Sequence, residues 1–348
     1  MHTSLSLVNR ILSFTCDVIN MHDLLQLDMF IHLKYNITMI KDEYDICIEL
    51  EVQPASHKRR LSSFLRKEMG ISGNCIRRAK TFDNIFVDGQ AEHTDYILSS
   101  GQLVGIVVPD KVTKSIIPSA DMKLDILYED DYLLALNKPY GILCHPIMNI
   151  DEDTLANGLK FKYPNMGIHP VSRLDRDTTG IVIYAKNSIV HHKMSVIDID
   201  KKYIGMVIGY PDNDEGTINM PIARVPDSAM LRCFDPQGKP SVTHYKILYK
   251  CHNAGILLFT LTTGRTHQIR VHCKESGFPI IHDTLYGIES VYDRYIKRQA
   301  LHSYQTSFTH PFTNEFITIT SPLHEDMQIL QNVIKENHLL TSNSSDML

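Results

Sequence analysis

Residues 169–186 read HPVSRLDRDTTGIVIYAK and join the densest polar cluster of the chain to a strongly apolar segment. The apolar half, TGIVIYAK (179–186), predicts a strand. The polar half brings Arg173, Asp175, Arg176 and Asp177 together within five positions directly before it. A turn that enters a buried strand is a favourable place to hold a carboxylate at the mouth of a cleft, and an adjacent Arg keeps such an Asp ionised. A surface salt-bridge cluster or a turn cap is the simpler structural explanation of the same residues.

Further strands are predicted around this segment. The stretch DILYEDDYLLALNKP (125–139) predicts two strands joined by an acidic turn. Additional strands are expected over 201–209, 241–250 and 255–263, with helices near 154–162, 187–196 and after Thr266. Thr266 is a candidate N-cap for a helix that runs to Gly277. Because several strands follow one another through turns, without full helices between them, the pattern favours an α+β fold with a mixed, mostly antiparallel sheet over a doubly wound one.

A short basic module precedes this region. Residues 57–80 hold eight Lys and Arg side chains against the single acid Glu68. The spacing of apolar residues predicts a helix that stops at Gly70 and a second short helix over 74–80. Strands are expected at 43–52, 85–89 and 102–108. A basic helix is often only a solvated surface, but so much charge in one window favours contact with phosphates, made by Lys58, Arg59, Arg60, Arg66, Arg77, Arg78 and Lys80.

Composition excludes several classes of protein. The 348 residues, 43% apolar and 22% charged, are typical of a globular chain of two domains and not of a fibrous or disordered one. No segment approaches the roughly 18 uninterrupted apolar residues of a membrane-spanning helix. Asn9 and Arg10 fall where a signal peptide needs its apolar run. Seven Cys without a CxxC pair predict reduced thiols and a cytoplasmic protein. The net charge of −5 is weak evidence against a nucleic-acid partner, because an average hides the basic window.

Three other segments are unusual. TTGRTHQIRVH (262–272) follows an apolar strand, KPYGILCHP (138–146) is a Pro-Gly loop after a strand, and RQALHSYQTSFTHPFTNE (298–315) places His and aromatic residues before a hairpin-like turn. His267 and His272 are five positions apart, which separates them on a helix and puts them on opposite faces of a strand. They are therefore poor joint metal ligands. The 18 His show no HExxH or similar pattern, so no metal site is expected.

Together these segments resemble the RluA-type pseudouridine synthases. The family pattern is K-P-x-G-x-x-x-H-P, H-R-L-D-x-x-T-S-G, K-x-Y-x-A-x-V-x-G and G-R-T-H-Q-I-R-V-H. This chain has KPYGILCHP, SRLDRDTTG, KKYIGMVIG and GRTHQIRVH in the same order, and ALHSYQTSFTHP matches the closing segment. It departs from the pattern at Ser172, which stands for the usual His, at Thr179 for Ser and at Gly205 for Ala. Residues of about 57–108 resemble the small ribosomal-protein-type RNA-binding module, in which two basic helices face an RNA backbone.

The resemblance implies a reaction and roles for particular residues. Asp175 would be the catalytic aspartate that helps to detach a uracil from its ribose, so that the base rotates and rejoins through another ring atom. It would act either on the uracil ring or at the anomeric carbon of the sugar. Tyr203 would stack on the uracil and help to remove a proton late in the reaction, and Arg270 would pair with the aspartate. Arg173 would help to open the RNA as the nucleotide flips out, and Leu174 would line the pocket. An isomerisation needs no cofactor, and none is expected.

Five segments follow from these features. We expect an N-terminal extension of unknown role over 1–40, the RNA-binding module over 41–110, a linker over 111–122, the pseudouridine synthase catalytic domain over 123–325 and a C-terminal tail over 326–348. One hypothesis is that the native polypeptide begins at Met39. The protein is expected to be a monomer that acts without a membrane or a metal.

Two other functions compete with a synthase. One is a non-catalytic RNA-binding or ribosome-assembly protein of the same fold. The other is a hydrolase that uses Asp175 with His302 or His310 as a general base. The RNA partner is expected to be ribosomal RNA, with transfer RNA as the alternative.

Overall fold

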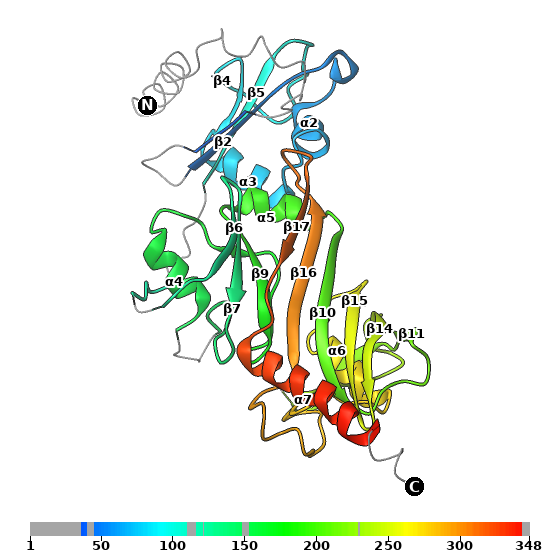
Figure 1. Ribbon diagram of the computed structural model, residues 1–348. Coiled ribbons are helices and arrows are strands. Elements are labelled where there is room, and N and C mark those ends of the chain that lie inside the picture. The colour runs from blue at the N-terminus through cyan, green and yellow to red at the C-terminus, as the bar shows by residue number, and fades with distance from the viewer. Residues whose placement is uncertain are drawn as a thin grey trace, which may run out of the picture. The chain divides into compact units, whose positions relative to one another are not determined.

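The computed structural model describes residues 36–39, 45–109, 116–120, 122–147, 153–228 and 230–342 (Figure 1). These residues form two compact units, one from the part of the chain up to residue 110 and one from the part after it. The part of the expected extension before residue 36 lies outside the described residues. So do residues 111–115 and 121 of the expected linker. Among the described residues, none of the helices is long and apolar enough to cross a membrane.

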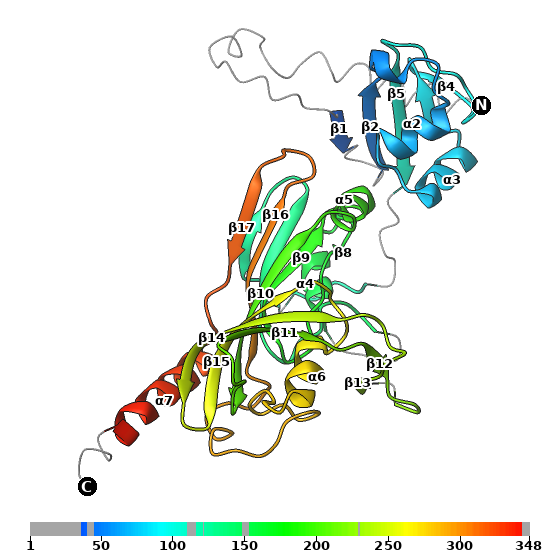
Figure 2. The same cartoon turned by 90° about the vertical axis from the view of Figure 1, so that its right-hand side faces the viewer.

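The N-terminal unit is a five-stranded antiparallel sheet with two short helices (Figure 2). The strand order is β1-β2-β5-β3-β4. Residues 36–39, which we expected to belong to the extension, form its edge strand β1. The elements are β1 (Asn36–Met39), β2 (Asp45–Glu51), a short 3-10 turn η1 (Pro54–Ser56), α2 (Leu61–Lys67), α3 (Gly73–Thr81), β3 (Ile85–Val87), β4 (Gln90–Ala91) and β5 (Leu103–Pro109).

The two helices of this unit are amphipathic. Helix α2 buries Leu61, Phe64 and Leu65, and α3 buries Cys75, Ile76 and Ala79. Ser72 is the N-cap of α3: its Oγ accepts a 3.2 Å hydrogen bond from the backbone N–H of Cys75. Because the apolar residues face the core at helical spacing, the intervening Lys and Arg side chains face away from it.

The C-terminal unit is built on a ten-stranded sheet with the path β11-β14-β15-β10-β16-β9-β7-β6. Strand β17 pairs with β16, and β8 pairs with β9. Among the pairs of the described strands, β9 with β16 is parallel and the others are antiparallel. The sequence-based prediction of a mixed, mostly antiparallel sheet is therefore confirmed. The strands are β6 (Ile126–Glu129), β7 (Leu133–Lys138), β8 (His169–Pro170), β9 (Thr179–Ala185), β10 (Ile199–Ile208), β11 (Glu215–Asn219), β14 (Val242–Cys251), β15 (Ala254–Leu261), β16 (Leu301–Thr309) and β17 (Phe316–Thr320), with a separate ribbon of β12 (Ile222–Arg224) and β13 (Arg232–Phe234).

Helices lie against this sheet, and two of them differ from expectation. They are α4 (Leu155–Lys162), α5 (Ser188–Met194), α6 (Gln268–Glu275) and α7 (Glu325–Ser342). Thr266 does not cap α6; the cap position belongs to His267, which has a left-handed backbone conformation with φ of 57°. Residues 326–342, expected as part of a tail, form most of α7, whose Met327, Leu330 and Ile334 are fully buried in the core of the C-terminal unit. These three residues recur at helical spacing, which is the signal in the sequence for this helix.

Gly180 brings the turn before β9 next to the centre of the sheet. Gly180 has φ of +103°, and a Cβ atom there would lie 2.2 Å from the backbone oxygen of Ser303. Only glycine permits so close an approach of β9 to β16. Ser303 is opposite Gly180 on one side and opposite Tyr203 of β10 on the other. The short parallel pairing thus places the turn that carries Asp175 beside the strand that carries Tyr203.

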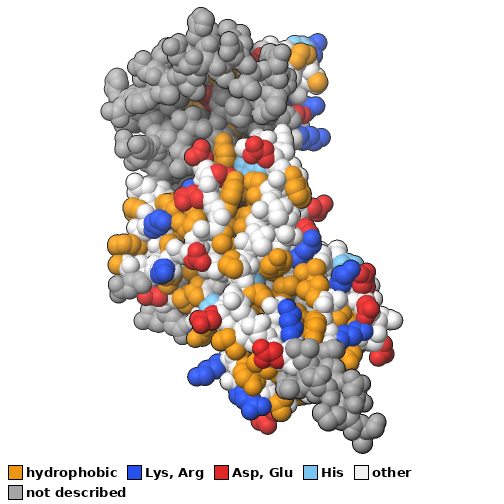
Figure 3. Space-filling model, in the orientation of Figure 1, with side chains coloured by type: hydrophobic (Ala, Val, Ile, Leu, Met, Phe, Trp, Pro, Cys, Tyr) orange, Lys and Arg blue, Asp and Glu red, His pale blue; other side chains and the backbone are white. Residues whose placement is uncertain are grey.

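Charge is distributed differently in the two units. On the face of the C-terminal unit drawn in Figure 3, acidic and basic side chains are interspersed with apolar ones. The N-terminal unit instead concentrates Lys and Arg on α2, α3 and the residues just before α2. The net charge of the whole chain therefore describes neither unit.

Candidate active site

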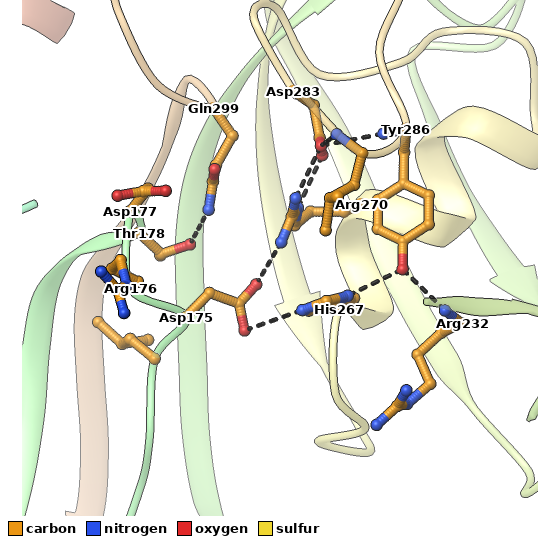
Figure 4. Close-up of polar contacts among 12 residues, drawn as sticks. Asp175, Arg176, Asp177, Thr178, Arg232, His267, Arg270, Asp283, Tyr286 and Gln299 are labelled. Carbon is orange, nitrogen blue, oxygen red and sulfur yellow. Dashed lines mark hydrogen bonds and ion pairs between the residues drawn. The ribbon is translucent and has the colours of Figure 1, made fainter. Parts of the chain in front are cut away.

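Asp175 lies in the turn between β8 and β9, with its side chain 25% exposed. The turn is closed by a 3.2 Å hydrogen bond from the N–H of Thr178 to the backbone oxygen of Asp175. A carboxylate in this position is open to solvent on one side and faces protein on the other. Figure 4 shows that Arg270 and His267 approach it from the protein side.

Three polar side chains fix this turn from behind. Lys138, which is fully buried, donates from Nζ to the backbone oxygen of Arg176 at 2.5 Å and to that of Pro139 at 2.8 Å. Arg298 donates from Nη1 to the backbone oxygen of Asp177 at 3.2 Å. Gln299 donates from Nε2 to Oγ1 of Thr178 at 3.1 Å. Burial lowers the pKa of Lys138 to about 8, so the position of the turn depends on a cation held out of water.

Arg270 bridges two carboxylates. It lies on α6, and its Nη1 donates to Oδ2 of Asp175 at 2.9 Å. Its Nε and Nη2 donate to Oδ2 and Oδ1 of Asp283, each at 2.7 Å. The side chain of Arg270 is 4% exposed and that of Asp283 is completely buried. Burial alone would lower the pKa of Arg270, but the hydrogen bonds and charges of Asp283 and the charge of Asp175 raise it above its usual value. The guanidinium is therefore a permanent buried cation with a fixed orientation.

Tyr203 lies on β10 and is buried in the core of the unit, 8% exposed. Burial raises the pKa of Tyr203 to about 12; a hydrogen bond with Ser303 opposes this shift, and the charge of Asp175 adds to it. At neutral pH the phenol keeps its proton. Its ring lies among apolar side chains, an environment suited to stacking against a planar base.

Arg173 and Leu174 directly precede Asp175, and their side chains lie in different environments. Arg173 is exposed, whereas Leu174 is buried, 9% exposed, in the core. The backbone of Leu174 is held by Cys144: its N–H donates to Sγ at 3.3 Å, and its oxygen accepts from Sγ at 3.5 Å. The structure thus gathers Asp175, Tyr203 and Arg270 with Leu174 beside them.

The residues predicted to bind RNA belong to the N-terminal unit and differ in exposure. Lys58, Arg60, Arg66, Arg77 and Lys80 are exposed, and Arg59 and Arg78 are half-buried. Arg59 forms an ion pair with Glu68 within the unit. Arg77 donates from Nη1 to Oδ1 of Asn74 at 3.2 Å, a contact on the surface of α3. The exposed members are the ones whose charge is most available to a partner.

The three departures from the family pattern each have a local structural role. Oγ of Ser172 accepts a 3.3 Å hydrogen bond from the N–H of Ile183 in β9. Oγ1 of Thr179 is 2.8 Å from Nδ1 of His302. A Cβ atom at Gly205 would lie 2.6 Å from the ring of Phe259 on β15. The aromatic ring therefore fills the space that the methyl group of an alanine would need.

The two histidines proposed for a hydrolase interact with other groups. His302 lies between Oγ1 of Thr179 and the backbone oxygen of Ser321, at 2.8 Å and 3.3 Å. His310 has its Nε2 3.3 Å from Oδ2 of Asp130. Burial lowers the pKa of His302 to about 4, so it is neutral. Among the described residues, these partners place neither histidine beside Asp175 as the general base that a hydrolase would need.

Sequence reasoning missed several residues of the site. No role is assigned to Asp283, Tyr286 or Gln299 from the sequence, and His267 is considered there only as a metal ligand. Asp283 comes two positions after the apolar run FPII (278–281), and this proximity to an apolar segment is the local signal that it could lie at the edge of the core. Lys138 and Arg298 belong to segments that are unusual in sequence, but their hydrogen bonds join parts of the chain that are far apart in sequence, which a single sequence does not show.

Comparison with known proteins identifies the class. A family model described as RNA pseudouridylate synthase matches residues 132–275. The fold resembles a solved structure titled Human RNA Pseudouridylate Synthase Domain Containing 4, with a TM-score of 0.51, 21% identity, and coverage of 61% of this chain and 93% of that one.

Relatives define the family more closely. The chain is 35% identical over 280 residues to the uncharacterized RNA pseudouridine synthase YjbO of Bacillus subtilis, covering 78% of this chain and 97% of that protein. It is 31% identical over 300 residues to the ribosomal large subunit pseudouridine synthase D of Buchnera aphidicola, covering 80% and 95%. The chain belongs to the RluA-type RNA pseudouridine synthases, which are isomerases.

Proposed function

We propose that this enzyme converts specific uridines of large-subunit ribosomal RNA to pseudouridine and that Asp175 is its catalytic residue. The observation that carries the proposal is the 2.9 Å hydrogen bond between Asp175 and a buried Arg270 whose Nε and Nη2 donate to Asp283. A partly exposed carboxylate with one fixed cationic partner is suited to act on a nucleotide that enters from solvent. The choice of ribosomal RNA is supported by the name of the Buchnera relative.

The reaction balances without an external reagent. The bond between C1′ of the ribose and N1 of uracil breaks, and a bond forms between C1′ and C5. The hydrogen on C5 leaves as a proton, and N1 gains one. The site must therefore hold the detached base, let it turn, and accept a proton from C5.

Three neighbouring residues have proposed roles in these steps. Tyr203 provides an aromatic surface for the uracil, and its phenol assists the late removal of the C5 proton. Because the pKa of Tyr203 is raised to about 12, this assistance requires that the phenol pass its own proton on as it takes the new one. Arg173, which is exposed, enters the space left in the RNA when the nucleotide flips out, and Leu174 lines the pocket.

The N-terminal unit is proposed to bind the RNA backbone. Its exposed Lys and Arg side chains lie on and just before two helices that contain no acid, and Glu68, directly after α2, is paired with Arg59. Phosphate contacts of this kind supply affinity without reading sequence.

The test of the catalytic role is Asp175→Asn. We expect the variant to fold and bind RNA normally but to release tritium from [5-³H]uridine-labelled RNA transcripts at least about a thousand-fold more slowly. Asp131→Asn, an exposed acid in the turn between β6 and β7, is the matched control and should keep wild-type activity. Substantial activity in Asp175→Asn would discard the catalytic assignment.

The RNA target needs a separate measurement. Pseudouridines are mapped in ribosomal and transfer RNA from cells with and without the gene, and again after complementation with the Asp175→Asn variant. Loss of a modification from large-subunit ribosomal RNA, restored only by the wild-type gene, is the expected result. Loss confined to transfer RNA would overturn the substrate assignment and leave the catalytic one intact.

A further inference from the structure

The second oxygen of Asp175 faces a histidine. Oδ2 accepts from Arg270, whereas Oδ1 lies 3.8 Å from Nε2 of His267. This separation is too long for a hydrogen bond and too short to admit a water molecule between the two atoms. A movement of less than about 1 Å would bring the pair to hydrogen-bonding distance.

His267 is held in an unusual position. It stands at the N-terminal end of α6 with a left-handed backbone conformation, φ 57°, which costs a residue other than glycine roughly 1 kcal/mol. Its side chain is only 11% exposed. Its Nδ1 lies 2.8 Å from the hydroxyl of the buried Tyr286, and the two rings meet edge to face. Such local strain persists where the surrounding structure determines the position, and it is common at functional sites.

The hydrogen bonds of Tyr286 indicate which nitrogen of His267 carries the proton. The backbone N–H of Arg232 donates to the Tyr286 hydroxyl oxygen at 2.9 Å. Burial raises the pKa of Tyr286, so its hydroxyl keeps a hydrogen, and Nδ1 of His267 is the acceptor within reach. If Nδ1 accepts, a neutral imidazole carries its hydrogen on Nε2, the atom that faces Asp175.

The charges around His267 favour the neutral form. Burial lowers its pKa; Asp175 and Asp283 raise it, while Arg270 and Arg232 lower it further, and the net shift is downward. These groups come from the turn before β9, from α6 and the segment after it, and from β13. A neutral Nε2–H beside Oδ1 adds a donor to the carboxylate without adding a second full positive charge next to Arg270.

We propose that His267, oriented by Tyr286, is a positioning residue that donates from Nε2 to Oδ1 of Asp175 when the site closes on RNA. Each carboxylate oxygen then has its own donor, and each donor is held by a buried partner: Arg270 by Asp283, and His267 by Tyr286 (Figure 4). The carboxylate would be fixed in rotation as well as in place. This inference rests on the proposed catalytic role of Asp175.

Kinetics of two variants test the positioning role. His267→Leu removes the donor and should lower kcat about 10- to 100-fold with little change in KM, the effect of losing one hydrogen bond to a charged group. His267→Gln places an amide N–H near the position of Nε2 and should recover most of the rate. His272→Gln is the matched control, because His272 lies on the same helix and interacts with Thr243 and Met220 instead of Asp175. Its kcat should remain that of the wild type.

The outcomes separate this inference from the proposed function. If Asp175→Asn is inactive while His267→Leu and His267→Gln both keep wild-type kcat, the positioning role is wrong and the catalytic role of Asp175 stands. If both substitutions of His267 lower kcat equally despite unchanged thermal stability, the donor role is also wrong. If Asp175→Asn is active, the proposed function itself fails.

The tautomer gives a readout that does not depend on activity. The ¹⁵N spectrum of histidine-labelled protein is assigned at His267 by difference from His267→Gln. We expect its Nε2 to carry the hydrogen at neutral pH and its Nδ1 to be unprotonated. A signal from the Nδ1–H tautomer would overturn the inference.

Discussion

The guanidinium of Arg270 donates to Asp175 from one edge and to Asp283 from another. The distances are 2.9 Å to Asp175 Oδ2 and 2.7 Å for each of the two bonds to Asp283. Asp283 is completely buried, whereas Asp175 is 25% exposed. The arrangement places the fixed half of the network inside the protein and leaves the reactive half open to substrate. A free lysine ammonium could not hold both carboxylates in the same way, because it lacks a planar fork of donors.

Removing the charge of Asp283 should affect both stability and catalysis. Asp283→Asn leaves Arg270 buried with a neutral partner, so we expect a loss of about 3 kcal/mol in the free energy of unfolding. We also expect kcat to fall at least about tenfold, because Arg270 can then turn away from Asp175. Chemical denaturation and tritium release measure the two effects. The control is Asp293→Asn, a partly exposed acid that bonds to Ser290 and should cost less than about 1 kcal/mol. Equal stability losses in the two variants would contradict this account.

Lys138 should make the stability of the protein depend on pH in the alkaline range. Its pKa is about 8 in the folded protein against an ordinary 10.5. Between these two pH values the unfolded chain binds more protons than the folded one, so the free energy of unfolding rises with pH. The rise over the whole range is about 3 kcal/mol. The unfavourable free energy of burying the charged Lys138 ammonium is fully present below pH 8 and is absent above pH 10.5. Lys138→Met should lack this rise when unfolding is followed by urea denaturation from pH 7.5 upward. Parallel pH profiles for the two proteins would show that Lys138 is not the source.

Tyr203→Phe separates the two proposed roles of this side chain. The ring remains for stacking, so RNA affinity should stay within about threefold of wild type. The phenol is removed, so kcat should fall about 100-fold, a typical contribution of one acid–base group. Tyr245→Phe, at a partly buried position of β14 that packs against the core, is the control for removal of a phenol elsewhere in the unit. A fall in RNA affinity without a change in kcat would assign Tyr203 to binding alone.

Charge removal in the N-terminal unit should change the salt dependence of RNA binding. Neutralising Arg60, Arg66, Arg77 and Lys80 to Gln should weaken binding and reduce the slope of log affinity against log salt by roughly 0.7–0.9 for each phosphate that is no longer neutralised. Arg59→Gln should have a smaller effect, because Arg59 is already paired with Glu68. Lys246→Gln and Lys335→Gln, which remove two exposed cations of the C-terminal unit, serve as controls for charge removal outside the N-terminal unit. An unchanged slope in the fourfold variant would refute the phosphate-binding role.

Much of the fold was predictable because its signals are local. The apolar segment over 179–186 became β9 (Thr179–Ala185), and the basic segment over 74–80 became α3 (Gly73–Thr81). Local signals also misled. Thr266 has the chemistry of a helix cap, yet the chain places His267 there in a strained conformation. A tail is predicted from the sequence where α7 forms, because the helical spacing of Met327, Leu330 and Ile334 does not by itself show the core on which they pack.

The sequence by itself determined the family, the succession of strands, and which Asp, Tyr and Arg to examine, because ordered motifs and apolar periodicity are written along the chain. Only the tertiary structure revealed that Arg270 is oriented by Asp283, that His267 faces the other oxygen of Asp175, and that Lys138 fixes the turn from behind. These relationships depend on burial and on packing between distant segments. Each charge loses its hydration only after the sheet has brought those segments together. Only then does a hydrogen-bonded partner become necessary to offset the cost of burying that charge.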